Sequence, residues 1–343
     1  MFPSPTITTD AALRDLHSPR PRVRAAAAAA LADCEPPRRT AVVDALIAAV
    51  DDPDADVRAA SALSLGDLGD PRASAPLILR LDDGAPAVRQ CAAVALGRLR
   101  AAAALEPLRR ALAKGPPDLR FQAATSLVEI DPASAAAPLT AALADPDPEV
   151  VGAAALALGS IGDAGAAGRL AALLDHSSPR TRFDAAYALA ELGDERAVPV
   201  LAGAAADRDL AWDAIEALEA VGAAAADALA GIGGNRGLDP EHRLRAAAAL
   251  LTAAPDHAEA GAARQWLLEP LRSWRRRRRG LAVELLGRVG GSWAIAPLEQ
   301  LRRASAGRRM SDEIGGALRR IRERMDTQDG RGGRDSQGES EGA

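Results

Sequence analysis

The apolar residues of this chain recur at helical spacing within short blocks that begin and end on recognisable signals. In one block, Val57, Leu65 and Leu68 fall on one side of a helix drawn at about 100° per residue. Asp52 can cap free backbone N–H groups, and Pro53 suits the first helical position because it lacks an N–H donor. Glycines near Leu68 supply a stop. The block therefore predicts one amphipathic helix.

This block repeats along the chain with a nearly constant period. Its copies align on an arginine or a residue in its place, and four consecutive intervals are 31 residues long. The aligned residues are Arg24, Arg58, Arg89, Arg120, Val151, Arg182, Ala211, Arg245 and Arg279. A second helix follows each block, marked by Leu77, Leu108, Leu139, Leu170 and Leu201. One helical pair cannot bury its own apolar face, so the pairs must stack. The pattern predicts an all-α superhelix, a solenoid of about nine helical pairs.

The motif itself resembles a known repeat. The run from Asp52 to Gly69, with Asp-Pro, Val-Arg, paired alanines and Leu-Gly-x-Leu-Gly, is similar to the short HEAT-like repeats named after phycobilisome lyases. The resemblance covers about residues 13–323, and it implies an armadillo-type solenoid fold. It leaves the function open, because one fold serves many unrelated tasks.

Composition agrees with thin, closely packed helices. Of the 343 residues, 84 are alanine, while aromatic residues make up 2% of the chain. Alanine is the strongest helix former and allows helices to approach closely. A core so poor in aromatic bulk excludes an ordinary β-sandwich, barrel or doubly wound sheet.

The first helix of each pair has a side that points away from the core. Counting from the valine before the arginine as zero, positions 0, 4, 7, 8 and 11 form the core, and position 5 is a small residue where neighbouring helices touch. Positions 2, 6, 9 and 10 point outward. In families with this repeat the first helix lines the concave surface. By resemblance, these outward positions are the expected binding face.

Aromatic and acidic residues gather in the outward positions of a few repeats. The chain holds three Phe and one Tyr, and exposed aromatics beside carboxylates commonly mark a protein-binding patch. The predicted partner-binding residues are Phe121, Phe183, Asp184, Tyr187, Glu191, Trp212, Asp213 and Glu216. They favour a protein partner with an Arg- or Lys-containing segment. The alternative is that position 2 is covered by the adjacent repeat.

Charge is unevenly distributed along the chain. The net charge is −5, yet residues 262–325 hold 16 Arg against 6 Asp and Glu, a net charge of +10. Candidate basic-surface residues are Arg275, Arg276, Arg277, Arg278, Arg302 and Arg303. This surface could meet nucleic acid, an acidic protein or anionic lipid, or could fold against the acidic part of the chain itself.

Composition shifts predict five segments. Residues 1–12 form an N-terminal extension, and residues 13–230 form an acidic arm of HEAT-like repeats. The Gly-rich stretch 231–240 is expected to be a connection between two arms. Residues 241–325 form the basic C-terminal arm of repeats, and 326–343, rich in Gly, Ser, Gln and charge, are expected to be disordered.

No catalytic, cofactor-binding or metal-ligating pattern appears in the sequence. The four histidines stand apart, and no His-Glu pair occurs, although related iron-binding hydroxylases use such pairs. With two cysteines and no stretch apolar enough to span a membrane, we expect a cytoplasmic protein. We predict a non-enzymatic scaffold or adaptor. The alternatives are a phycobilin-lyase-like or other enzyme or enzyme subunit, and a nucleic-acid binder using the basic arm.

Overall fold

A computed structural model describes residues 8–304 and 309–335 and contains helices and no strand in those ranges. The chain divides into two compact units, residues 1–188 and 189–343, and the boundary falls within one helix. The first unit contains α1 (Thr9–Asp15), α2 (Pro21–Ala30), α3 (Arg39–Ala49), α4 (Ala55–Leu68), α5 (Ser74–Arg80), α6 (Pro86–Arg98), α7 (Leu105–Lys114), α8 (Pro117–Ile130), α9 (Pro132–Ala142), α10 (Pro148–Ser160), α11 (Ala167–Ala172) and most of α12 (Pro179–Glu191).

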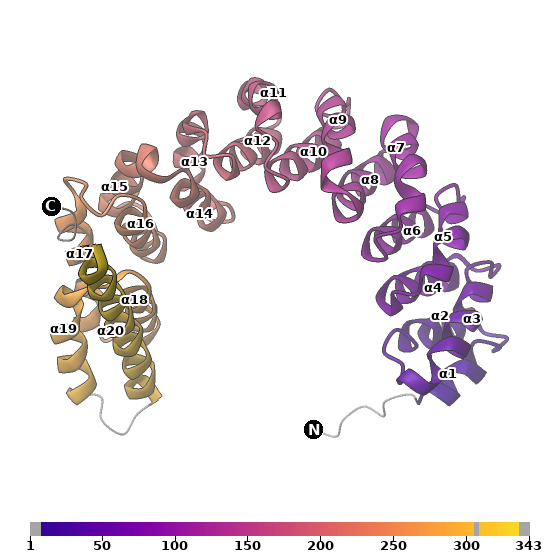
Figure 1. Cartoon of the computed structure of the whole chain (residues 1–343), viewed down its shortest axis with the longest axis horizontal. Coiled ribbons are helices and arrows are strands. Elements are labelled where there is room, and N and C mark those ends of the chain that lie inside the picture. The colour runs from indigo at the N-terminus through magenta and orange to yellow at the C-terminus, as the bar shows by residue number, and fades with distance from the viewer. Residues whose placement is uncertain (1–7, 305–308, 336–343) are drawn as a thin grey trace, which may run out of the picture. The chain divides into compact units, whose positions relative to one another are not determined.

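The helices of the first unit form two rows (Figure 1). The first row contains α2, α4, α6, α8 and α10, and each of these packs on the next. In the second row, α3, α5, α7 and α9 each pack against the first-row helix of the following repeat. Within the described residues, α2/α3 to α18/α19 make nine helical pairs. The predicted all-α solenoid is confirmed.

The core lies between the two rows, on the residues that the repeat pattern selects. In α4, Val57 and Leu65 are fully buried, and Leu68 is 4% exposed. The second-row leucines and the small residues at position 5 are also buried; they include Leu77, Leu108, Leu139, Leu170, Leu201, Ala62, Ala93, Ala124, Ala155 and Ala186. The expected core face is therefore the observed one.

The repeat arginines form a ladder between successive repeats of the first unit. Arg58 Nε and Nη2 donate to Asp83 Oδ2 and Oδ1 at 2.9 and 2.8 Å, and its Nη1 donates to the carbonyl oxygen of Asp52 at 2.9 Å. The Arg58 guanidinium thus binds both the loop of its own repeat and an aspartate of the next repeat. Equivalent pairs are Arg24–Asp52, Arg89–Asp118 and Arg120–Asp145.

The ladder changes the role predicted for Asp52. The N-cap of α4 is Asp54, whose side chain accepts from the N–H groups of Asp56 and Val57. Asp52 instead accepts from the Asp54 N–H at 2.9 Å while it binds Arg24. The carboxylate orders the loop before the helix and joins two repeats. A repeat whose anchor is Val151 has no guanidinium for this rung.

Position 9 of the first helix is buried in α4 and α6, which corrects the expectation that it points outward there. Gly66 and Gly97 occupy this position and are both buried. A Cβ atom on Gly66 would lie 2.8 Å from the Ala95 Cα of α6. Real Cβ atoms do not approach backbone so closely, so the missing side chain allows α4 and α6 to pack closely.

The second unit repeats the two-row arrangement. It contains the end of α12, α13 (Val198–Ala204), α14 (Ala211–Val221), α15 (Ala226–Gly234), α16 (Pro240–Ala253), α17 (Ala260–Leu268), the 3₁₀ helix η8 (Glu269–Arg272), α18 (Arg276–Val289), α19 (Ser292–Ala304) and α20 (Arg309–Asp335). Helices α14, α16, α18 and α20 pack in succession, and α15 packs closely on α16 (Figure 1).

The glycine-rich segment 231–240 is not a connection between arms. Gly231–Gly234 belong to α15, and the remaining loop joins two helices that pack together. A Cβ on Gly233 would lie 2.7 Å from the Trp266 ring. The glycine therefore makes room for Trp266, a packing role that composition alone does not distinguish from flexibility.

The C-terminal segment differs from its expected disorder. Helix α20 continues to Asp335, so it includes the first part of the segment 326–343. No proline occurs after Arg309 to stop the helix. Residues 336–343 lie outside the described residues, as do 1–7 of the expected N-terminal extension. None of the described helices is long and apolar enough to span a bilayer.

The ladder predicts a loss of stability in acid. Hydrogen bonds from Arg24 and Arg58 hold the pKa values of Asp52 and Asp83 below their ordinary range. A carboxyl whose folded pKa is lowered stabilises the protein above its unfolded pKa, and this contribution is lost as the pH falls through the folded pKa. We expect the melting temperature of the first unit to decrease once the pH is lowered below about 4. Calorimetry from pH 7 to pH 3 measures this decrease. A variant with Asp83→Asn and Arg58→Met should show a smaller decrease in melting temperature over the same pH range.

Candidate functional site

The eight predicted partner-binding residues divide between the two units. Phe121, Phe183, Asp184 and Tyr187 belong to the first unit, whereas Glu191, Trp212, Asp213 and Glu216 belong to the second. Each group is therefore considered within its own unit.

The expected exposure of Phe183 and Asp184 on α12 is wrong. Phe183 is 4% exposed; one turn away on either side, Arg180 Cζ lies 5.8 Å from its ring centroid and the Tyr187 ring lies 6.3 Å away. Asp184 is 5% exposed and binds Arg180 at 2.9 Å. Its Oδ2 occupies the space that a Cβ on Gly152 of α10 would need, at 2.4 Å. Burial raises the Asp184 pKa, and the nearby Arg180 opposes that shift. These two side chains are covered by neighbouring structure.

The other two residues of the first unit have different surroundings. Phe121 on α8 is 40% exposed. Tyr187 is half-buried beside Phe183. Position 2 of the repeat is therefore exposed in one helix and buried in another, and in α10 it is the buried Gly152.

Trp212 on α14 is the exposed aromatic of the predicted set in the second unit. It is 51% exposed, and Arg245 of α16 lies over its ring with Cζ 3.1 Å from the centroid. Burial lowers the Arg245 pKa from its ordinary value, and the nearby Glu284 and Glu241 oppose this shift. The chain itself thus supplies the guanidinium that was expected from a partner, and it covers one face of the indole.

Two carboxylates beside Trp212 remain available. Asp213 and Glu216 are exposed on α14, and neither forms an ion pair with another described residue. By contrast, Glu219, on the next turn of α14, binds Arg288 of α18 at 3.0 Å. Glu191 is exposed at the end of α12, and desolvation of its carboxyl raises its pKa.

We call the surface formed by Trp212, Asp213, Glu216, Arg245 and Arg288 the α14 face. It draws on three successive first-row helices, α14, α16 and α18, that pack in order. Arg245 and Arg288 were not predicted for this surface. The repeat pattern marks Arg245 as an anchor, but a helical wheel does not report contacts between helices.

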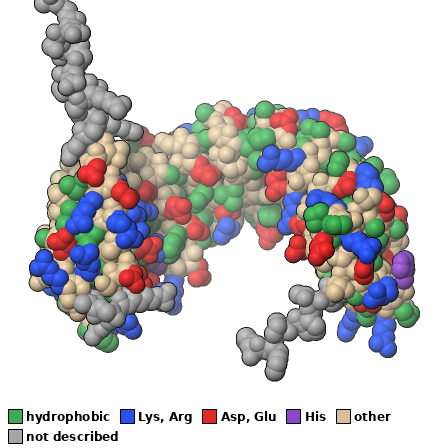
Figure 2. Space-filling view, turned by 60° about the horizontal axis from the view of Figure 1, so that its bottom comes forward, with side chains coloured by type: hydrophobic (Ala, Val, Ile, Leu, Met, Phe, Trp, Pro, Cys, Tyr) green, Lys and Arg blue, Asp and Glu red, His purple; other side chains and the backbone are tan. Residues whose placement is uncertain are grey.

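The predicted basic residues lie on α18 and α19 and just before α18. Arg275, Arg276, Arg302 and Arg303 are exposed. Arg277 binds Glu241 of α16 at 2.9 Å, and Arg278 is half-buried. Figure 2 shows basic side chains over this end of the second unit, with acidic side chains among them.

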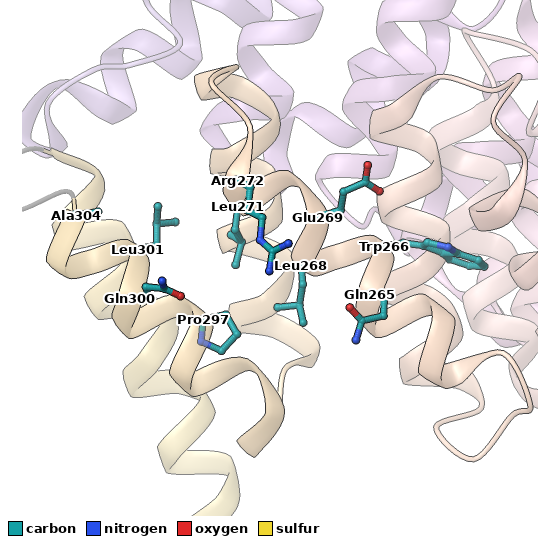
Figure 3. A pocket seen from close by; sticks show the side chains of 10 residues that line it. All are labelled: Gln265, Trp266, Leu268, Glu269, Leu271, Arg272, Pro297, Gln300, Leu301 and Ala304. Carbon is teal, nitrogen blue, oxygen red and sulfur yellow. The ribbon is translucent and has the colours of Figure 1, made fainter.

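A cavity in the second unit lies between α17, η8 and α19 (Figure 3). Its volume is about 560 Å³, and Trp266, Leu268, Arg272 and Leu301 are among the residues that line it. In the described ranges, no three His, Cys, Asp or Glu side chains lie close enough together to hold a metal ion.

Known proteins similar to this chain occur among the solved structures. No curated protein matches the sequence. Among solved structures, the complex of CpcE and CpcF of phycocyanin lyase from a Nostoc species is 25% identical, with 66% of this chain and 94% of that chain covered and a TM-score of 0.45. Human deoxyhypusine hydroxylase is 24% identical, with 72% and 96% covered and a TM-score of 0.34.

Importin beta has a higher structural similarity, with a TM-score of 0.58 at 14% identity. The alignment covers 91% of this chain and 52% of importin beta, so this chain matches about half of that protein. The family model for HEAT repeats matches residues 10–84, 43–128, 74–156, 111–175 and 136–222. These matches together span more than half of the chain, and the protein belongs to the HEAT-repeat family.

Proposed function

We propose that this chain is a non-enzymatic adaptor that binds a protein partner on the α14 face, with a basic segment of the partner against Asp213 and Glu216. The observation that carries the proposal is the half-exposed Trp212 ring beside two carboxylates without ion-pair partners. Large aromatic side chains next to charged groups supply much of the binding energy in protein interfaces.

The contact between Arg245 and Trp212 supports this proposal in a specific way. A guanidinium stacked on one ring face fixes the indole in one orientation and leaves the other face to a ligand. A side chain that is already ordered loses less conformational entropy on binding. A lysine or arginine of the partner would then meet Asp213 and Glu216 beside a fixed apolar surface.

The test removes the ring without disturbing the core. We expect Trp212→Ala to weaken partner binding by about 2 kcal/mol, roughly thirtyfold in Kd. Its melting temperature should stay close to the wild-type value, because the side chain is half-exposed. The experiment compares proteins captured from native cytosol by wild-type and variant baits and then measures affinity for the captured partner by calorimetry.

A matched control is Leu79→Ala, which removes another exposed apolar side chain, 67% exposed, from the second-row helix α5. This control should retain the partner. The charge-reversing pair Asp213→Lys and Glu216→Lys should lose it. A Trp212→Ala protein that melts several degrees lower yet binds its partner normally would show that Trp212 is structural and would refute the proposal.

A further inference from the structure

A second exposed aromatic lies outside the α14 face. Trp274 lies two residues before the start of α18 and is 83% exposed, more than any other large apolar residue of the described ranges. Arg275 Cζ lies 5.6 Å from the ring centroid. The remaining exposed large apolar residues are Leu79, Phe121 and Trp212. Trp274 therefore has no exposed apolar residue of that size next to it in the sequence.

Three arginines near Trp274 lack ion-pair partners among the described residues. Arg272, Arg275 and Arg276 are exposed, and none of them forms an ion pair with another described residue. The first turn of α18 holds no acidic residue, and Arg275 provides no side-chain cap. Arginines at the positive end of a helix repel its dipole, so this charge arrangement is unfavourable until an anion joins it.

A cavity adjoins these residues. Its volume is about 380 Å³, and Arg243, Arg272, Arg278 and Ser273 line it together with one carboxylate, Glu269. It shares Trp266, Glu269 and Arg272 with the larger cavity of about 560 Å³. Figure 3 shows Arg272 and Gln300 on opposite sides of that larger cavity. Arg272 is thus one of the exposed arginines and also lines two cavities that share Trp266.

We propose that the surface made by Arg272, Trp274, Arg275 and Arg276, the Trp274 surface, binds single-stranded nucleic acid. A base stacks on the Trp274 ring, and the adjoining phosphates contact the arginines. Every base offers a π face, and phosphates supply the anions that this cluster lacks. An acidic protein is less well matched, because protein-binding hot spots lie within an apolar centre that Trp274 does not have.

This proposal is independent of the α14 face, since it rests on other residues and another ligand. The test uses the full chain and a fluorescein-labelled oligo(dT) of about 15 nucleotides. Fluorescence anisotropy at low salt should detect binding that weakens steeply as salt is added. We expect Trp274→Ala to weaken binding about tenfold, which is the loss of one stacked base. The variant with Arg275→Glu and Arg276→Glu should lose at least as much.

Two controls separate a site from general charge. Arg20→Glu with Arg22→Glu makes the same charge change on exposed arginines of the first unit and should change affinity less than twofold. Trp212→Ala removes the other exposed indole and should have no effect on oligo(dT). Circular dichroism and melting curves should match the wild type for all variants, because each altered side chain is exposed.

Several results would overturn the proposal. One is a wild-type chain that does not bind oligo(dT) at low salt. Another is a Trp274→Ala variant with unchanged affinity, which would leave only general electrostatic attraction. A third is tighter binding of duplex DNA than of oligo(dT). Equal or tighter binding of poly-glutamate, competing with oligo(dT), would instead assign the surface to an acidic protein.

Discussion

Replacing Arg58 with methionine is expected to destabilise the first unit by about 3 kcal/mol. The substitution keeps the aliphatic stem but removes the guanidinium that binds Asp83 at 2.8 Å. The side chains of the pair are 15% and 5% exposed, so the buried Asp83 carboxylate would lose its hydrogen-bonded cation and keep only Arg80, at 3.8 Å. Removing one member of a buried ion pair lowers stability far more than replacing both members with apolar side chains.

The expected result is a melting temperature lower by roughly 6–12 °C, for a unit of this size. Thermal unfolding gives the midpoint, and hydrogen exchange shows whether α4 and α6 open first. Arg98→Met is the matched control. It removes the exposed ion pair between Arg98 and Asp67, whose side chains are 46% and 44% exposed, and it should cost less than about 1 kcal/mol.

The double variant Arg58→Met with Asp83→Asn tests the cause. The asparagine Oδ1 can still accept from the Ala85 N–H, which Asp83 now binds at 2.9 Å, and the buried carboxylate charge is gone. We expect most of the lost stability to return. If the double variant is as unstable as Arg58→Met, lost packing rather than an uncompensated charge is responsible.

The second large effect is expected at Gly66. A valine there would place its Cβ 2.8 Å from the Ala95 Cα and 2.9 Å from its Cβ, so α4 and α6 must separate. Overpacking of this kind costs about 1–3 kcal/mol, and the contact with backbone gives the larger value because no side chain can rotate away. We expect Gly66→Val to lose about 3 kcal/mol in thermal unfolding.

Gly280, also inside a first-row helix, is expected to give the opposite result. It lies inside α18, and a Cβ there would meet nothing within 4 Å. Gly280→Ala should therefore stabilise the second unit by about 0.5–1 kcal/mol, because alanine has the higher helix propensity. Equal effects at Gly66 and Gly280 would mean that helix propensity, and not helix spacing, determines both.

Part of the α14 face could be predicted from the sequence. The outward wheel positions of Trp212 and Glu216 follow from their offsets within the repeat, with Asp213 alongside Trp212, and all three are exposed. The same rule failed at Phe183 and Asp184, which have the same offsets as Trp212 and Asp213 but are buried. Arg180 of the same helix lies over the Phe183 ring, and the missing side chain of Gly152 leaves room for the Asp184 carboxylate.

The sequence by itself determined the helices, their pairing and the core face, because those depend on local propensity and on a periodic apolar pattern. The tertiary structure alone decided which outward positions reach solvent. That depends on the distance between neighbouring helices, which residues such as Gly66 control. It also decided that the repeat arginines bind the next repeat's aspartate and that Arg245 stacks on Trp212. Those contacts join residues 25 to 33 positions apart, and a pattern within one helix contains no information about them.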